Sequence, residues 1–185
     1  MTPDELSGKA QDTGCGISGT LMRTVNNKCI DPLDFKLDDV DINDIAHALA
    51  MQCRYNGHSV GHLSVARHSL WVSEKLAEKD PYMWPPRNRM LQLAGLLHDA
   101  AEAYTGDLIR PLKHRPELAA FLDIEASIEG VIAERFQVDL TDPRIKEADV
   151  WVLVHREVNA RQWYTGNALQ DKAQFLGRFA LLGGK

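Results

Sequence analysis

From Asp41 to the C-terminus, apolar side chains recur every three or four residues, which is the spacing of an amphipathic helix. The clearest stripe lies in residues 64–79, SVARHSLWVSEKLAEK, and consists of Val65, His68, Val72 and Leu76. No stretch of residues 41–185 alternates apolar and polar side chains for long enough to predict a strand. The sequence therefore predicts an all-α fold.

Helix boundaries can be placed from capping residues and from Gly and Pro. Asp41 or Asn43 is expected to cap the first helix, and Gly57 follows its end. Ser64 is expected to cap the second helix, and Asp142 the fifth. The sequence predicts a compact bundle of about six helices, the later five at residues 64–79, about 87–104, 117–136, 142–163 and 170–182.

Residues 1–40 differ from the rest because they are rich in Gly, Thr, Asn and Asp. They are expected to form an irregular N-terminal arm, with a short extended segment around residues 21–25. With 185 residues and 20.7 kDa, the chain is long enough for one domain with a substantial core. We therefore expect an arm, 1–40, and one helical domain, 41–185.

The overall charge and the cysteines argue against several classes of protein. A formal net charge of -5 gives no electrostatic reason to expect binding to a nucleic-acid backbone, although a local cationic cluster could still bind a small anion. Because Cys15, Cys29 and Cys53 have no CxxC spacing, the sequence predicts reduced thiols, which suits a cytoplasmic protein. No apolar run approaches the length of a membrane span, and the N-terminus has no signal pattern.

The sharpest local feature is GLLHDAAEAYTGD, residues 95–107, in which His98 and Asp99 follow an apolar helical run. Burying an imidazole beside a carboxylate costs free energy unless both have partners, and a divalent cation satisfies both at once. Glu102 lies one helical turn further along the same face, where it could act on water rather than bind the ion. This segment supplies half of a candidate metal site.

Two further ligands are expected from other helices, because two residues alone would hold an ion weakly. His68 lies on the apolar stripe of its helix, and Asp149 precedes the apolar run 150–154. Taken singly, such residues are more often a hydrogen-bonded core histidine or a helix cap than a ligand. Two His and two Asp together form a mixed nitrogen and oxygen set that suits Mn, Co, Zn, Fe, Ni or Mg, and such an ion promotes phosphate-ester hydrolysis.

The order His68, His98-Asp99, Asp149 resembles that of the HD-domain metal-dependent phosphohydrolases. The resemblance covers about residues 20–165 and is carried by the strings DINDIAHALAMQCRYNGH, LSVARHSLWVSEKL, LLHDAAEAYTGDLIRPLK and IKEADVWVLVHRE. It is strongest for the small phage and bacterial branch that contains 5′-deoxynucleotidases and phage dATP triphosphohydrolases. It implies an HD-domain helical bundle, a divalent metal bound by these four residues, and a homo-oligomer, either a dimer or a hexamer.

The resemblance also implies roles around the metal. Glu102 matches the family's acid or base, and Asp107 matches its second acid. Arg54 with Tyr55 matches the pair that contacts the substrate's phosphate and its sugar or base. Lys113 offers further positive charge for phosphate. From the residues alone, Arg54 and Lys113 could equally be exposed cations, and Asp107 could cap the next turn.

Other polar residues near these motifs have less definite roles. His58 and His62 flank the loop ahead of the first ligand and are expected in a substrate loop or at the surface. Arg67 and His62 depart from the family pattern. His155 and Glu157 are expected at the surface or behind the metal ligands.

The predicted function is metal-dependent hydrolysis of a deoxynucleotide. The leading hypothesis, which rests on the resemblance, is a dNTP triphosphohydrolase that converts dATP to the deoxynucleoside and triphosphate. The alternative is a 5′-deoxynucleotidase that acts on dNMPs. A non-catalytic nucleotide-sensing HD protein, hydrolysis of cyclic nucleotides or (p)ppGpp, and a helical interaction module are less favoured. No nucleic-acid polymer or membrane is expected as a partner.

Overall fold

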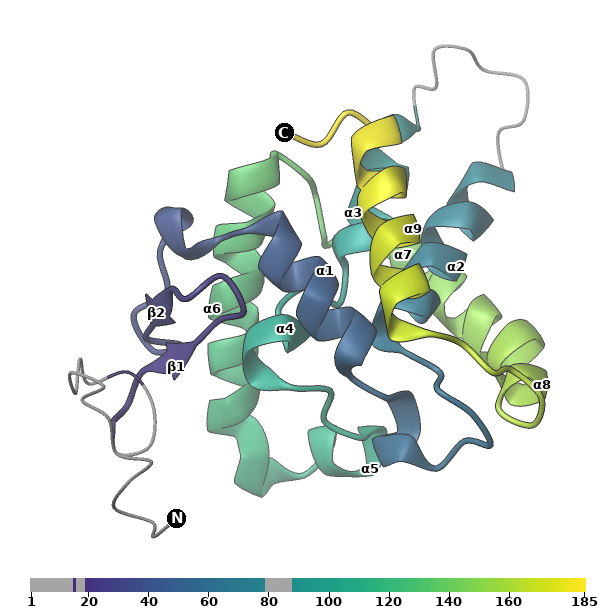
Figure 1. The fold of residues 1–185 in the computed structure, drawn as a ribbon, viewed down its shortest axis with the longest axis horizontal. Coiled ribbons are helices and arrows are strands. Elements are labelled where there is room, and N and C mark those ends of the chain that lie inside the picture. The colour runs from purple at the N-terminus through teal and green to yellow at the C-terminus, as the bar shows by residue number, and fades with distance from the viewer. Residues whose placement is uncertain (1–14, 16–18, 79–87) are drawn as a thin grey trace, which may run out of the picture.

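A computed structural model describes residue 15, residues 19–78 and residues 88–185. This part of the chain is mostly helical with two short strands, which confirms the predicted all-α class (Figure 1). Within the same residues, no helix combines the length and the apolar character of a membrane span. The first residues of the expected arm, the end of the predicted helix at 79 and the start of the next at 87 lie outside the described residues.

The helices begin largely where capping residues predict. The α-helices, in chain order, are α1 (Ile42–Met51), α2 (Val65–Glu78), α3 (Arg89–Leu97), α4 (Glu102–Thr105), α5 (Arg110–Lys113), α6 (Ala119–Phe136), α7 (Pro143–Val152), α8 (Val158–Ala160) and α9 (Ala168–Leu181). Asp41 caps α1 and Asp142 caps α7, each by accepting a hydrogen bond from the amide two residues on. The Ser64 hydroxyl accepts one from the Arg67 amide at the start of α2. These bonds satisfy amides that a helix leaves without a partner.

Helix α2 is central because it packs against α1, α3, α7 and α9. Helix α1 also packs against α4 and α9, so the chain wraps around one shared core (Figure 1). The largest fully buried apolar side chains are Ile30, Ile45, Leu49, Leu63, Leu76, Leu93, Leu96, Leu97, Ile128, Ile132 and Phe175. The apolar stripes identified in the sequence therefore face this core.

The prediction of one continuous third helix over about residues 87–104 is wrong, because α3 ends at Leu97 and α4 begins at Glu102. The Ala100 amide bonds the Leu97 carbonyl at 2.9 Å, and the Tyr104 amide bonds the Ala101 carbonyl at 2.9 Å. Such bonds, which span three residues instead of four, turn the chain by roughly 120° per residue instead of 100°. His98 and Asp99 therefore lie in a tight turn at the end of α3.

Two further segments differ from the prediction. The fifth helix, predicted at 142–163, contains a π-helical turn, η5 (Leu153–Glu157), between α7 and α8. Gly106 has a φ of 87° and ends α4, and Pro111 then lies in the first turn of the short helix α5, which was not predicted. A 3-10 turn, η4 (Pro116–Leu118), leads into α6. The proline that suggested a break instead begins a helix, because proline suits the first turn.

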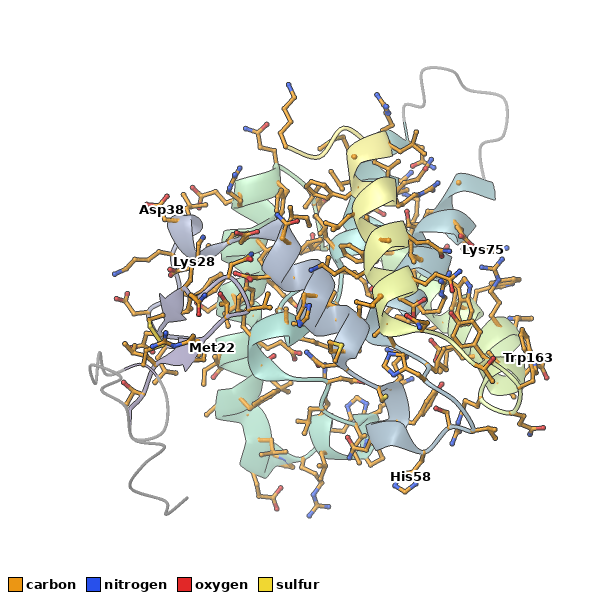
Figure 2. The ribbon with its side chains drawn as sticks, in the orientation of Figure 1. Met22, Lys28, Asp38, His58, Lys75 and Trp163 are labelled. Carbon is orange, nitrogen blue, oxygen red and sulfur yellow. A yellow bond between two sulfur atoms is a disulfide. The ribbon has the colours of Figure 1, made fainter. Side chains whose placement is uncertain are left out.

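The described part of the arm forms a hairpin beside the bundle. Strand β1 (Met22–Arg23) pairs antiparallel with β2 (Cys29–Ile30), so the extended segment expected at 21–25 is present. Figure 2 shows Met22 and Lys28 on this hairpin, at the opposite end of the view from Trp163. The buried side chain of Ile30 joins the arm to the core.

The expectation of three reduced thiols is wrong in this structure. A disulfide joins Cys15 and Cys29, while Cys53 is free. The spacing rule missed the pair because the cysteines are 14 residues apart and the fold brings their Cα atoms to 5.6 Å. The bond links Cys15 to β2.

Candidate metal centre

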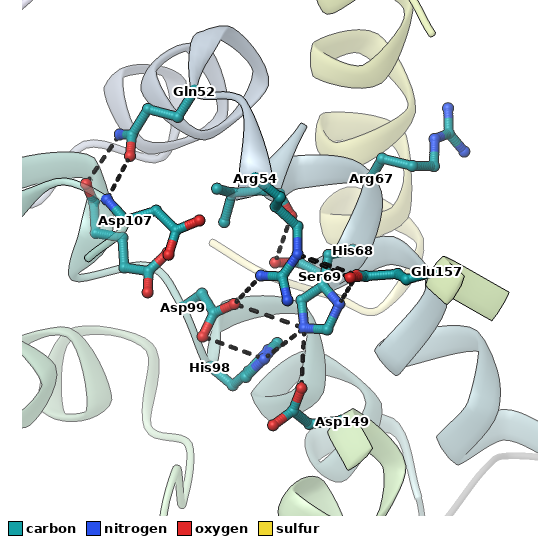
Figure 3. Close-up of polar contacts among 12 residues, drawn as sticks. Gln52, Arg54, Arg67, His68, Ser69, His98, Asp99, Asp107, Asp149 and Glu157 are labelled. Carbon is teal, nitrogen blue, oxygen red and sulfur yellow. Dashed lines mark hydrogen bonds and ion pairs between the residues drawn. The ribbon is translucent and has the colours of Figure 1, made fainter. Parts of the chain in front are cut away.

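Four side chains from three parts of the fold lie close together (Figure 3). His68 comes from the first half of α2, His98 and Asp99 from the turn after α3, and Asp149 from α7. Nε2 of His68 lies 3.2 Å from Nε2 of His98 and 3.2 Å from Oδ1 of Asp149. Asp99 places Oδ1 3.2 Å from Nε2 of His98 and Oδ2 3.6 Å from Nε2 of His68.

These separations fit the ligand shell of a divalent ion. Ligand atoms held about 2.0–2.2 Å from a tetrahedral metal lie about 3.3–3.6 Å from one another, because the tetrahedron fixes their spacing. His68, His98 and Asp149 each offer one such atom, and these atoms lie within 4.8 Å of one another, with Nε2 of His68 3.2 Å from each of its two neighbours. Asp99 lies beside them but approaches the two histidines with different oxygens, Oδ1 to His98 and Oδ2 to His68. Two imidazoles and two carboxylates also form a donor set that several first-row ions accept. His68, His98 and Asp149 could therefore hold a metal ion, with Asp99 next to them.

Both histidines are oriented by a second bond on the far side of the ring. Nδ1 of His68 lies 2.5 Å from Oε1 of Glu157, and Nδ1 of His98 lies 2.9 Å from the Gly95 carbonyl. A proton on each Nδ1 makes these hydrogen bonds and leaves each Nε2 lone pair pointing to the shared centre. Metal-binding histidines usually have such an acceptor behind them.

The electrostatic surroundings of the four residues favour a positive charge between them. Burial opposes a charged His68, yet its bonds to Asp149 and Glu157 raise its pKa above the usual value. Burial and the neighbouring His68 lower the pKa of His98. Although burial opposes ionised carboxylates, the adjacent histidines hold the pKa values of Asp99 and Asp149 below their usual range. The carboxylates around the two histidines therefore favour positive charge at this centre.

A cavity of about 450 Å³ opens beside this centre, which leaves room for a small molecule. Its wall contains each of the predicted companions of the metal: Arg54, Tyr55, Glu102, Asp107 and Lys113. The structure therefore brings all nine predicted site residues into one region, although it does not by itself assign their roles.

Glu102 and the partly exposed Lys113 lie in contact on the wall of the cavity. Nζ of Lys113 lies 2.8 Å from Oε1 of Glu102 and 2.9 Å from Oε1 of Glu125. Oε2 of Glu102 is buried without a hydrogen-bond partner. Burial, with repulsion from Asp99 and Asp107, raises the pKa of Glu102 to about 9. Lys113 is therefore held by both Glu102 and Glu125, and Glu102 takes up a proton more readily than an exposed glutamate.

Asp107 is held near Glu102 by a residue that the sequence analysis missed. The side-chain amide of Gln52 donates to the Glu102 carbonyl at 2.9 Å and accepts from the Asp107 amide at 3.0 Å (Figure 3). Burial raises the pKa of Asp107 above its usual range. Gln52 directly precedes the Cys53-Arg54 segment, but no spacing or composition signal marks it as a clamp on a loop 50 residues later.

Arg54 and Tyr55 begin a strained turn, η3 (Arg54–Gly57), at the edge of the cavity. Tyr55 has a φ of 58°, Asn56 of 51° and Gly57 of 77°, so two side-chain-bearing residues adopt the left-handed conformation. Nη1 of Arg54 lies 3.6 Å from Oδ2 of Asp99, which brings a guanidinium next to the metal ligands. Neighbouring carboxylates, Glu157 first among them, outweigh burial and raise the pKa of Arg54, so its charge is permanent.

The remaining polar residues named from the sequence lie outside the ligand set. His58 is exposed and points away from the molecule (Figure 2). His62 bonds the Ala50 carbonyl through Nε2 at 2.7 Å. Arg67 pairs with the buried Asp171, which ties α2 to α9. His155 is exposed and stacks on Trp151.

Comparison with known proteins adds relatives but no activity. No family model matches the chain. An uncharacterized protein of Rhodobacter capsulatus is 42% identical over 93 residues, which are 49% of this chain and 45% of that protein. The uncharacterized protein YfdR of Escherichia coli K12 is 32% identical over 117 residues, 63% of this chain and 58% of that protein. The chain thus spans about half the length of these curated relatives, and its function must be inferred from the site.

Proposed function

We propose that this chain is a divalent-metal-dependent phosphohydrolase of the HD-domain type that hydrolyses dNTPs, with dATP as the preferred substrate. The observation that carries the proposal is the facing pair of Nε2 atoms, 3.2 Å apart, with two carboxylates beside them. Both Nδ1 atoms have acceptors, and one ligand atom each from His68, His98 and Asp149 lies within 4.8 Å of the other two. A cation satisfies all four groups at once.

In this proposal His68, His98, Asp99 and Asp149 hold the ion. The ion, which could be Co, Zn, Mn, Mg or Ni, supplies Lewis acidity that neutralises phosphoryl charge and makes water more acidic. Arg54 binds the phosphate, because its guanidinium lies beside Asp99 and lines the cavity.

Proton transfer falls to the two acids next to the ligands. Glu102, with a pKa of about 9, can give its proton to the leaving oxygen of the ester. Asp107, less buried and held by Gln52, can accept a proton from the attacking water. Tyr55 covers the sugar or base, and Lys113 fixes Glu102 rather than the phosphate. The preference for dATP rests on the resemblance of the sequence to phage triphosphohydrolases.

In this proposal the protein is a homo-oligomer, either a dimer or a hexamer. It acts in the cytoplasm, or in the host cytoplasm if the chain is encoded by a phage. No nucleic-acid polymer or membrane takes part.

A substrate screen with varied metal tests the proposal. Purified protein stripped of metal is incubated with each dNTP and dNMP in the presence of Co, Zn, Mn, Mg or Ni. We expect triphosphate and deoxyadenosine from dATP, and no turnover by Asp99→Ala. Release of phosphate from dNMPs with dNTPs untouched would replace the proposal with a 5′-deoxynucleotidase. Nucleotide binding without any turnover would indicate a sensor.

A further inference from the structure

Glu157 is a fully buried carboxylate that receives three hydrogen bonds from two other parts of the fold. Nδ1 of His68 lies 2.5 Å from Oε1, and the Tyr55 hydroxyl lies 2.5 Å from Oε2. Nε of Arg54 lies 3.0 Å from Oε1 and 3.1 Å from Oε2. Burying a carboxylate is costly, and these donors offset that cost and hold the pKa of Glu157 at about 2 despite its burial.

The position of Glu157 depends on the π-helical turn. Glu157 follows Asp149 by eight residues, since 157 − 149 = 8, which in a regular α-helix would separate their directions by about 80°. A π turn accommodates one extra residue, so the two directions differ by only about 20°. Asp149 and Glu157 therefore face the same way, two turns apart, and both reach His68, one at each ring nitrogen (Figure 3).

The partners of Glu157 belong to both halves of the proposed site. His68 is a metal ligand, whereas Arg54 is the proposed phosphate-binding residue and lies 3.6 Å from Asp99. Tyr55 anchors the left-handed turn η3, whose conformation costs about 1–3 kcal/mol per residue that carries a side chain. The guanidinium of Arg161, 4.1 Å from the centre of the Tyr55 ring, holds the same turn from outside.

We propose that Glu157 is a positioning residue that orients His68 toward the metal and fixes Arg54 toward the phosphate, so that metal affinity and anion affinity depend on one carboxylate. This inference rests on the proposed function, because it takes His68 as a ligand and Arg54 as the phosphate contact. It adds a residue and a dependence that the four ligands alone do not imply.

The test uses the full-length chain loaded with Co²⁺. The Glu157→Gln side chain keeps its shape but loses its charge and one acceptor, so cobalt affinity, measured by competition with a chelator, should fall about 10–100-fold. Binding of inorganic phosphate to the cobalt-loaded variant should weaken as well. Tyr55→Phe removes one donor to Glu157 and leaves the bond to His68, so its loss of cobalt affinity should stay below about tenfold. Glu134→Gln, an exposed charge change on α6, is the control and should bind cobalt as the wild type does.

A spectroscopic signature separates orientation from a general loss of charge or of stability. In the cobalt protein the Nδ1 protons of His68 and His98 should give two exchangeable proton signals shifted by the metal. Glu157→Gln should move or broaden one of them and leave the signal of His98, which bonds the Gly95 carbonyl, in place. If Glu157→Gln does not fold, Glu157→Asp, with a shorter carboxylate, should show the same selective change.

Each outcome decides something. If the folded Glu157 variant binds cobalt with the affinity of the wild type and keeps both proton signals unchanged, the inference is overturned and the proposed function stands. Equal loss in Glu157→Gln and Glu134→Gln would also overturn it. Failure of the wild type to bind any of the five metals would overturn both.

Discussion

Replacing Lys113 by Met distinguishes a lysine that positions Glu102 from one that binds phosphate. Lys113 makes two charge-assisted hydrogen bonds, at 2.8 Å to Glu102 and 2.9 Å to Glu125, and its side chain is 27% exposed. Each such bond contributes about 1.5–3 kcal/mol. Partial exposure and the proton that Glu102 can take up both reduce the loss. We therefore expect the free energy of unfolding to fall by about 2–4 kcal/mol.

The kinetic effect of Lys113→Met should appear in kcat. Without the ammonium group, Glu102 loses the contact that fixes its carboxyl, so kcat should fall by about 100-fold while KM stays within about twofold. The melting temperature, followed by circular dichroism, should fall by about 5–15 °C for a chain of this length. Arg110→Met, on the same short helix with an exposed side chain, is the control and should change unfolding by less than about 0.5 kcal/mol. A raised KM with unchanged kcat and melting temperature would refute the reasoning and return Lys113 to phosphate binding.

Three further predictions concern the surroundings of the site and the arm. Gln52→Leu removes the two hydrogen bonds that join the Glu102 carbonyl to the Asp107 amide. The free energy of unfolding, measured in urea, should therefore fall by about 1–3 kcal/mol, and kcat should fall too. An unchanged kcat would exclude a positioning role for Gln52. The pKa of Glu102 is about 9 in the folded chain against 4.5 ordinarily, so the folded state holds the extra proton between these values. The free energy of unfolding of the metal-free protein should therefore fall as pH rises from about 5 to about 9, and Glu102→Gln should flatten that slope, whereas an equal slope in both proteins would contradict the assignment. Cys15→Ser removes the disulfide between residues 14 apart, so the free energy of unfolding should fall by about 3 kcal/mol under oxidising conditions and stay unchanged under reducing ones. A thiol titration that finds three free thiols without reductant would contradict the disulfide.

Much of the fold follows from local rules in the sequence. Asp41, Ser64 and Asp142 begin helices because their side chains accept bonds from amides at the start of the helix. Local rules did not find the break after Leu97 or the π turn before Val158. At both places the apolar pattern continues, so periodicity alone gives no sign of the irregular turn. Both irregular segments carry residues of the site.

The ligand set could be proposed from the sequence because each member stands on or next to an apolar stripe and matches a known order of motifs. The residues that hold the site residues in place could not be predicted, because Glu157 is 89 residues from His68 in the sequence and Gln52 is 55 residues from Asp107. Such contacts depend on how α2, α4 and η5 meet in space. From the sequence alone, Glu157 could be either a surface residue or a residue behind the metal ligands. Its complete burial against His68 favours the second alternative.

Anomalous diffraction from crystals soaked in Co²⁺ tests the central claim most directly. We predict a strong peak between the facing Nε2 atoms of His68 and His98, about 2.0–2.2 Å from both and within reach of Asp99 and Asp149. His68→Ala should lose the peak when soaked in the same way. No peak at this position, or an equal peak in His68→Ala, would contradict the metal centre on which the proposed phosphohydrolase depends.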